Sequence, residues 1–205
     1  MTTSTGEAPS SDGCHRPVAV RPVLYDAVTL RHFAAVSRLD LLYACHNDRE
    51  EPRWTATVRE EVSRAAHLGV SECLSILEMS WLGEPLTPAI EDLRAIARLR
   101  VALGNAGFEA EDEAAESKHL GEAESIQMAL RFGYCFVTDD NDAYSLAKGR
   151  LGIGRVFDTV ELLRLAVANG DLTVPDAIDV ANRIRTAGRY LRHTYERLLT
   201  PADFT

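Results

Sequence analysis

The fold is decided by a short apolar run that ends in two acids, Tyr134-Cys135-Phe136-Val137-Thr138-Asp139-Asp140. Gly133 precedes this run and Asn141 follows it, so turn-forming residues bound it on both sides. A continuous apolar run of this length, without alternating polar residues, is typical of a strand buried on both faces of a parallel sheet. We therefore expect a buried parallel strand whose carboxyl end carries aspartates.

Three other short segments have the composition of strands, namely residues 23–25, 53–56 and 155–157. Helical patterns separate them, and strands that alternate with helices indicate an α/β fold with a parallel sheet of about four strands. Residues 21–170 are predicted to form one such domain. Residues 171–205 are predicted to be a C-terminal helical extension, packed on or following the same domain. Residues 1–20 are expected to be a disordered arm.

Two predicted helix starts carry capping signals. Thr57 is followed three residues later by Glu60, which has the form of a capping box. Asp158 and Glu161 have the same spacing, directly after the segment 155–157.

Composition and charge exclude several classes of protein. The chain has 205 residues, of which 46% are hydrophobic, so it can bury a core, and no apolar run is long enough for a membrane span. No secretory signal is recognisable, and a cytoplasmic location is expected. Four irregularly spaced cysteines predict reduced, mostly buried thiols and argue against a zinc site. The net charge of −9 excludes a basic field over the whole molecule, so a polyanion would need a local patch or a bound cation.

Two predicted strands end in aspartate. Asp26 follows residues 23–25, and Asp140 follows residues 134–138. Either aspartate alone is explained as the N-cap of the next helix. Because the carboxyl ends of parallel strands meet at one edge, where open α/β sheets bind ligands, neighbouring strands would bring both acids to one crevice.

Two helical acids extend this set. Glu61 lies three residues after Val58 and four before Ala65, on the apolar stripe of its predicted helix. Such a carboxylate is either at the rim of the core or directed at a partner that neutralises it. Glu122 stands in the first turn of a predicted helix, where complementarity to the helix dipole also explains it.

Four acids at one edge would repel one another unless a cation lay between them. Oxygen ligands with retained water are what Mg²⁺ or Mn²⁺ accepts, and such ions polarise phosphoryl oxygens and activate water. The set Asp26, Glu61, Glu122 and Asp140 therefore predicts metal-assisted hydrolysis of a phosphodiester.

These residues resemble the PIN-domain family, and within it the VapC-like proteins of bacterial toxin–antitoxin pairs. The resemblance covers about residues 22–199, and four segments carry it: residues 23–27, 58–62, 120–126 and 137–140. In that family an Asp ends the first strand, a Glu lies in a following helix, an acid begins a later helix, and T-x-D follows the next strand. This chain departs from the pattern with Ala27 where Thr is usual and Glu122 where Asp is common.

The resemblance implies a three-layer PIN-like fold and an endoribonuclease that cleaves single-stranded RNA. It implies that Asp26, Glu61, Glu122 and Asp140 hold Mg²⁺ or Mn²⁺. The products would carry a 5′-phosphate and a 3′-hydroxyl. An antitoxin partner and a homodimer are implied as well.

Supporting roles at this expected site follow from the same resemblance. Thr138 would orient the water or an acid, and Asp139 and Asp142 would support the ligands. Glu124 is also near, but it falls about 200° from Glu122 around a helix, so only one of the two can face the site.

A basic segment near the C-terminus includes Arg189 and Arg192, interleaved with aromatic residues. These arginines could bind the RNA backbone while the aromatic residues stack bases. Docking of an acidic partner or a second subunit explains the segment equally well.

Two other functions compete with the ribonuclease. One is a PIN-like module that binds RNA or a partner with little turnover, and the complete set of four acids favours the enzyme over it. The other is a phosphatase of the haloacid dehalogenase type, which also begins with a strand ending in Asp. That chemistry requires D-x-D, and Val28 occupies the second position here.

Overall fold

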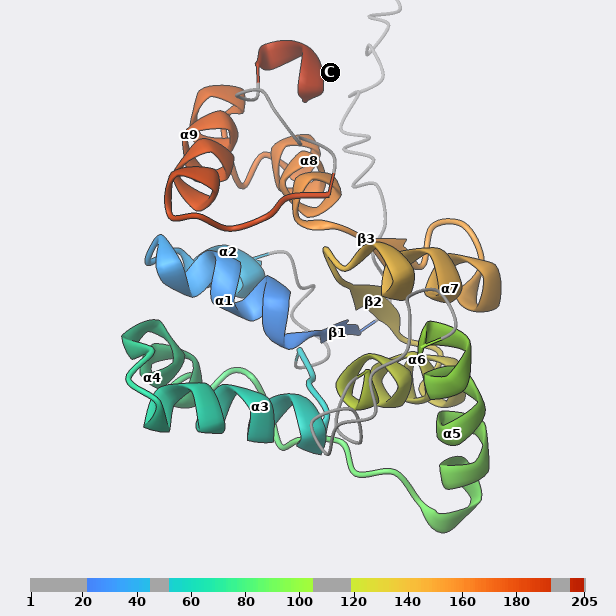
Figure 1. The fold of residues 1–205 in the computed structure, drawn as a ribbon. Coiled ribbons are helices and arrows are strands. Elements are labelled where there is room, and N and C mark those ends of the chain that lie inside the picture. The colour runs from blue at the N-terminus through green and yellow to red at the C-terminus, as the bar shows by residue number, and fades with distance from the viewer. Residues whose placement is uncertain (1–21, 45–51, 105–118, 193–199, 205) are drawn as a thin grey trace, which may run out of the picture.

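The computed structural model describes residues 22–44, 52–104, 119–192 and 200–204 (Figure 1). The predicted disordered arm, together with Cys14 and Cys45, lies outside these residues. Cys73 and Cys135 are buried thiols, as the cysteine pattern predicted.

A small parallel sheet lies at the centre of the described residues (Figure 1). It contains β1 (Val23–Tyr25), β2 (Cys135–Val137) and β3 (Val156–Phe157), hydrogen-bonded in that order. Leu24 pairs with Phe136, and Val137 pairs with Phe157. The α/β class and the parallel sheet are therefore confirmed.

The prediction of about four strands is wrong for the described residues, which contain three. Arg53 makes only an isolated parallel bridge to Leu24, through two backbone hydrogen bonds of 2.9 Å. The segment does not continue as a strand because Thr55 already caps the next helix, which begins at Ala56.

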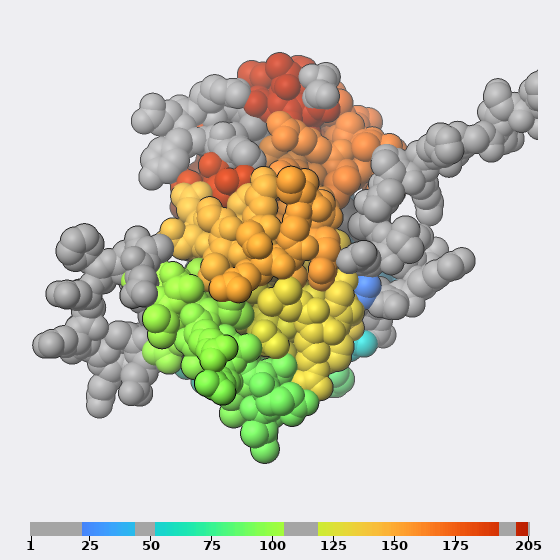
Figure 2. All heavy atoms as spheres, turned by 90° about the vertical axis from the view of Figure 1, so that its right-hand side faces the viewer, coloured from blue at the N-terminus to red at the C-terminus, as the bar shows by residue number. Residues whose placement is uncertain are grey.

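Helices cover both faces of the sheet and so make three layers (Figure 1). The layer packed on one face contains α1 (Ala27–Ala35), α2 (Leu39–Ala44), α3 (Ala56–His67), α4 (Ser71–Leu77), α8 (Thr159–Asn169) and α9 (Val174–Thr186). The other face is covered by α5 (Ile90–Gly104), α6 (Leu120–Phe132) and α7 (Asn141–Leu151), whose outer surface faces the viewer in Figure 2. A short 3₁₀ turn, η2 (Pro201–Asp203), follows near the C-terminus.

The strands divide their side chains between two cores. Tyr25 and Val137 point into the core with α1, α3 and α8, whereas Leu24, Phe136 and Val156 point into the core with α6 and α7. This alternation follows from the two-residue period of a strand. Burial on both faces explains why the strands are apolar throughout.

The predicted C-terminal extension packs into the first of these cores. Ala177, Val180 and Ile184 of α9 are fully buried and belong to the same apolar cluster as α1 and α8. The Arg183 guanidinium also donates to the backbone oxygen of Val36, at the end of α1, over 2.8 Å. Among the described residues, no helix is long and apolar enough to cross a bilayer.

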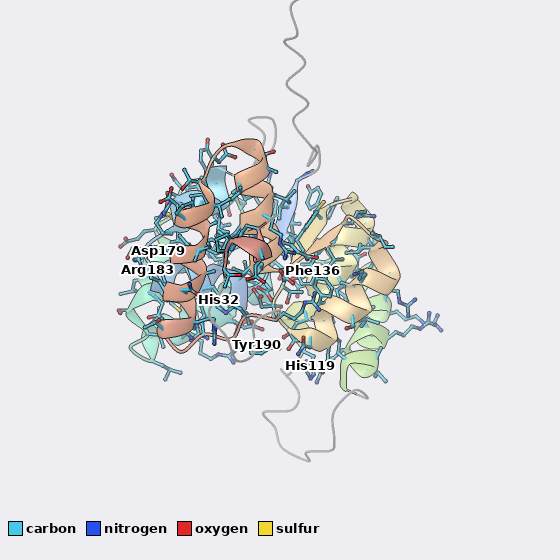
Figure 3. The ribbon with its side chains drawn as sticks, turned by 90° about the horizontal axis from the view of Figure 1, so that it is seen from above. His32, His119, Phe136, Asp179, Arg183 and Tyr190 are labelled. Carbon is cyan, nitrogen blue, oxygen red and sulfur yellow. The ribbon has the colours of Figure 1, made fainter. Side chains whose placement is uncertain are left out.

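The central strand gives a test of this architecture. Phe136 is fully buried and lies in the middle of the molecule (Figure 3). We expect Phe136→Ala to lower the free energy of unfolding by about 3 to 5 kcal/mol, because it leaves a cavity between β2 and the helices that cover it.

Phe132, which is 46% exposed and stacks on Tyr134, is the matched control. Phe132→Ala is expected to cost only about 0.5 to 1.5 kcal/mol. Denaturant unfolding of both variants measures the difference, and equal losses would contradict the placement of Phe136 in the core.

Candidate functional site

Each strand of the sheet is followed directly by an aspartate. Asp26 follows β1, Thr138 separates Asp139 from β2, and Asp158 follows β3. The backbone N–H of Asp26 donates to the carbonyl oxygen of Val137 over 3.3 Å, which continues the β1–β2 pairing by one residue. The strand ends therefore bring Asp26 and the segment 138–140 together at one edge, as the sequence predicted.

Asp26 is the least satisfied acid of this edge. Its Oδ1 caps α1 by accepting the Thr29 N–H over 2.6 Å, so the N-cap explanation holds for that oxygen. Its Oδ2 is buried and receives no hydrogen bond from the part of the chain that the structure describes. The pKa of Asp26 is raised to about 7, mainly because the side chain is buried. Contacts with Thr138 and Thr29 oppose this shift in part, and the charge of Asp139 adds to it. Capping alone does not account for this side chain.

Glu61 points from α3 toward the first turn of α6. A Cβ atom placed on Gly121 would lie 2.7 Å from Oε1 of Glu61, so the carboxylate occupies the space that the missing side chain leaves. Burial raises the pKa of Glu61 to about 7, and the charges of Glu122 and Asp26 add to the shift. Glu61 thus belongs to the same group of acids as Asp26.

Glu122 and Asp140 complete the predicted set. Burial raises the pKa of Glu122, and the nearby charge of Asp140 raises it further. Asp140 caps α7 by accepting the Ala143 N–H over 2.7 Å, while its own N–H donates to the Thr138 hydroxyl over 3.1 Å. Each of the four predicted acids therefore interacts electrostatically with another of the set.

Glu124 is held apart from Glu122 by a contact with α3. The helical angle predicted only that these two acids could not both face the site, and the charge of Glu124 still adds to the raised pKa of Glu61. Glu124 is 4% exposed and lies against the start of α3, where the Thr57 hydroxyl donates to its Oε2 over 2.5 Å. Thr57 is therefore not the N-cap that the sequence suggested. Thr55 caps α3 instead, accepting the Val58 N–H over 3.3 Å, and Glu60 is exposed and pairs with Arg64.

Two aspartates of the edge are fully paired. Asp139 accepts hydrogen bonds from the backbone and hydroxyl of Thr159, and its Oδ2 lies 3.2 Å from Nδ1 of His32. Asp158 caps α8 in the predicted capping box with Glu161. It also forms an ion pair of 3.1 Å with the guanidinium of Arg192. Asp142, expected in a supporting role, is exposed in the first turn of α7.

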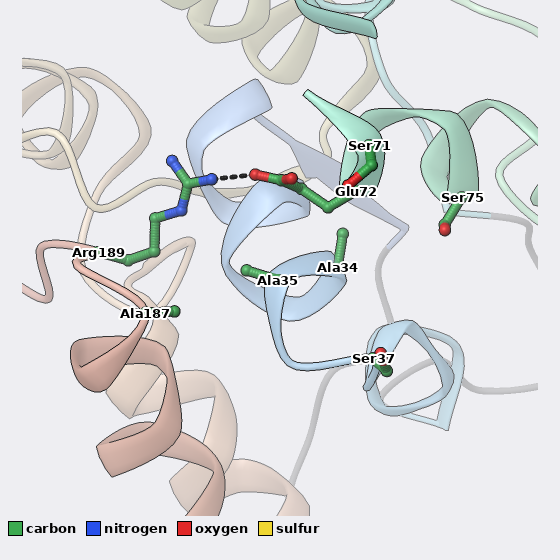
Figure 4. Close-up of a pocket in the computed structure, with 8 residues that line it drawn as sticks. All are labelled: Ala34, Ala35, Ser37, Ser71, Glu72, Ser75, Ala187 and Arg189. Atoms are coloured by element: carbon green, nitrogen blue, oxygen red, sulfur yellow. Dashed lines mark hydrogen bonds and ion pairs between the residues drawn. The ribbon is translucent and has the colours of Figure 1, made fainter. Parts of the chain in front are cut away.

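Both predicted RNA-binding arginines have carboxylate partners within the chain. Arg189 pairs with Glu72 of α4 (Figure 4). Arg192 pairs with Asp158 and lies over the ring of Tyr144, 3.6 Å from its centre. Sequence reasoning missed these partners because they come from helices distant in the chain.

The donor set fits a hard divalent cation, although the acids do not form a closed cage. Within residues 22–44, 52–104, 119–192 and 200–204, no three acids, histidines or cysteines are close enough to hold one ion. Mg²⁺ is usually held by only one or two carboxylates, with water and substrate phosphate as its other ligands. The unpartnered Oδ2 of Asp26 is an atom that such an ion would satisfy.

A separate cavity of about 490 Å³ lies between α1, α4 and the end of α9 (Figure 4). It contains the Arg189–Glu72 pair but none of the four predicted acids. The residues that line it are Ala34, Ala35, Ser37, Ser71, Glu72, Ser75, Ala187 and Arg189.

No protein-family model, curated protein or solved structure matches the chain.

The raised pKa of Asp26 predicts a stabilising substitution. An unfolded Asp titrates near 3.8, whereas the folded state holds the proton up to about pH 7, so ionisation of Asp26 lowers stability as the pH rises between these values. Asn keeps an oxygen that can cap α1 but carries no charge. We therefore expect Asp26→Asn to be more stable than the wild type at pH 8 and similar to it near pH 4.

Denaturant unfolding in the presence of a chelator measures this difference. Asp40→Asn is the control, because Asp40 is exposed and pairs with Arg38 at the surface. A variant Asp26→Asn that is less stable than the wild type at pH 8 would show that the charge is accommodated by contacts with the protein.

Proposed function

We propose that the protein is a Mg²⁺- or Mn²⁺-dependent endoribonuclease of the PIN-like type that hydrolyses single-stranded RNA. The observation that carries the proposal is the group of acids around Asp26. One of its oxygens is buried without a partner, and the pKa values of Asp26 and Glu61 are both raised to about 7. Without a bound cation, these close acids lower the stability of the folded chain. Acids with strongly shifted pKa values occur most often at functional sites.

The proposed roles follow from the positions of the residues. One or two of the acids Asp26, Glu61, Glu122 and Asp140 would bind the ion directly and the others would bind it through water. The ion when bound would activate water and stabilise negative charge on the phosphate. Thr138 holds the start of α7 through the Asp140 N–H and contacts Asp26, so it fixes the positions of two acids relative to each other. Asp139 is held in place by Thr159 and His32, and its charge adds to the raised pKa of Asp26.

One observation favours a second candidate function, a PIN-like module that binds RNA or a protein with little turnover. Among the residues that the structure describes, no three candidate ligands are close enough to share an ion. A metal-dependence assay separates the two functions, because only the nuclease requires the ion for product formation.

The proposed biological setting is a toxin–antitoxin pair. It rests on the resemblance of the acid-bearing segments to VapC-like proteins. In this setting the ribonuclease is the toxin, and a partner protein blocks the carboxylates.

The proposed reaction predicts metal-dependent cleavage. We expect the wild type to cut a labelled single-stranded RNA with Mn²⁺ or Mg²⁺, to leave 5′-phosphate ends, and to stop when EDTA is added. Loss of a group that supports a metal ligand typically lowers activity by about 10- to 100-fold. Asp26→Asn and Asp140→Asn should each lower the rate of RNA cleavage by more than this. Both substitutions keep a side chain that can cap a helix, so the fold is expected to persist.

Asp179→Asn is the control, since Asp179 is exposed on α9 and pairs with Arg183. Cleavage that continues in EDTA, or that survives both substitutions, would exclude the proposed site. RNA binding without metal-dependent cleavage would favour the second candidate.

The contact between Gly121 and Glu61 predicts a second, more local effect. Gly121→Ala would bring a methyl group to 2.7 Å from Oε1 of Glu61, so the carboxylate must move. We expect the variant to keep its fold, because Ala favours a helix more than Gly does. Its stabilisation by Mn²⁺ should be smaller than that of the wild type, which is about 2.7 kcal/mol when Mn²⁺ is a hundredfold above its dissociation constant.

Gly149→Ala is the matched control. Gly149 lies within α7, and no atom is within 4 Å of the position that its Cβ would take. Melting with and without Mn²⁺ measures both variants. An unchanged response of Gly121→Ala to Mn²⁺ would remove Glu61 from the ion site.

A further inference from the structure

A short segment after α9 crosses the carboxyl edge of the sheet, and we name it the C-terminal strap (residues 188–192). Each side chain of residues 189–192 makes contacts with other parts of the protein. Arg189 pairs with Glu72 of α4, and Leu191 is 1% exposed in the core. Arg192 pairs with Asp158, and its backbone N–H donates to Oδ1 of Asp139 over 3.4 Å. The strap is therefore fixed beside the proposed site from both sides.

Tyr190 is the residue of the strap that reaches solvent. It is 39% exposed, and the Asn141 side chain donates to its hydroxyl oxygen over 3.0 Å. Asn141 begins α7 and directly follows Asp140, so the ring is anchored one residue away from a proposed ion ligand. Figure 3 labels Tyr190 in a view from above.

In the strap, which ends the described range 119–192, charge provides little attraction for RNA. The chain carries a net charge of −9, and the guanidinium groups of Arg189 and Arg192 are paired with Glu72 and Asp158. Binding of RNA close to the acids therefore requires contacts that do not depend on net charge. Stacking of a base on an aromatic ring is such a contact, and it is worth most when the ring is already held in place.

We propose that the ring of Tyr190 is the stacking platform for a nucleobase of single-stranded RNA next to the phosphodiester that the acids act on. This inference rests on the proposed ribonuclease function and adds the residue that holds the substrate. It assigns base contact to Tyr190, and it leaves Arg189 and Arg192 as the ion pairs that hold the strap.

The test measures RNA binding in the Asp26→Asn background, so that the RNA is not cut. The probes are a short fluorescent single-stranded RNA of mixed sequence and its fully abasic counterpart. We expect Tyr190→Ala to weaken binding of the intact RNA by about 5- to 150-fold, which corresponds to about 1 to 3 kcal/mol per stacked base. The loss should be the same at about 50 mM and 200 mM salt, because stacking releases no counterions.

Two further variants separate the ring from the strap. Tyr190→Phe keeps the ring but loses the hydroxyl that Asn141 contacts, and it should bind the intact RNA nearly as tightly as the parent. Tyr43→Ala is the control for an exposed tyrosine elsewhere, since Tyr43 lies on α2 and packs against Trp81 with ring centres 5.9 Å apart. It should not weaken binding.

The outcomes distinguish this inference from the function on which it rests. The stacking role is overturned if Tyr190→Ala binds intact RNA as tightly as its parent does, or if it loses affinity for abasic RNA by the same factor as for intact RNA. Neither result contradicts the proposed nuclease function. If the parent binds no RNA and the wild type cuts none, the proposed function fails, and the role of Tyr190 fails with it.

Discussion

The parallel pairing of β1 with β2 is the constraint on which the rest of the candidate site depends. Because Tyr25 lies opposite Val137, the residues that follow these strands must share one edge, and both strands are followed by acids. Two helices then add Glu61 and Glu122 to the same region. Carboxylates that are partly withdrawn from water and close to one another resist ionisation, which is the physical reason for the raised pKa values.

The edge accommodates its acids in two different ways. Asp139 and Asp158 are buried, but Thr159, His32 and Arg192 supply hydrogen bonds and an ion pair, so these two side chains connect β2 and β3 to α1, α8 and the strap. Asp26 is equally buried, yet its Oδ2 has no partner. The contrast separates acids whose oxygens are satisfied by contacts within the fold from an acid with one oxygen that the described residues leave without a hydrogen bond.

Much of this arrangement was predictable from local patterns. The apolar run 134–138 and its following acids predicted β2 and the edge, and the angular separation of Glu122 from Glu124 predicted that only one of them could face the other acids. Other predictions were wrong or incomplete because they depend on tertiary contacts, which local sequence patterns do not reveal. The cap of α3 moved to Thr55 because the Thr57 hydroxyl is used by Glu124, which is distant in sequence. Likewise, Arg189 and Arg192 look like a basic patch in the sequence, but their carboxylate partners come from α4 and from the start of α8.

The fold tolerates these close, buried acids because apolar packing determines the positions of the helices that carry them. Asp26 caps α1, whose Leu30 and Phe33 are fully buried, so the helix start is determined by the core and by one carboxylate oxygen only. Burial of Val58 and Val62 likewise positions α3, and with it Glu61. The absence of a side chain at Gly121 leaves room for the Glu61 carboxylate. The free energy that holds the acids together is therefore supplied by apolar burial on the far side of each helix. In an arrangement of this kind, the fold does not depend on the other carboxylate oxygen of Asp26, which is buried without a hydrogen bond from the described residues.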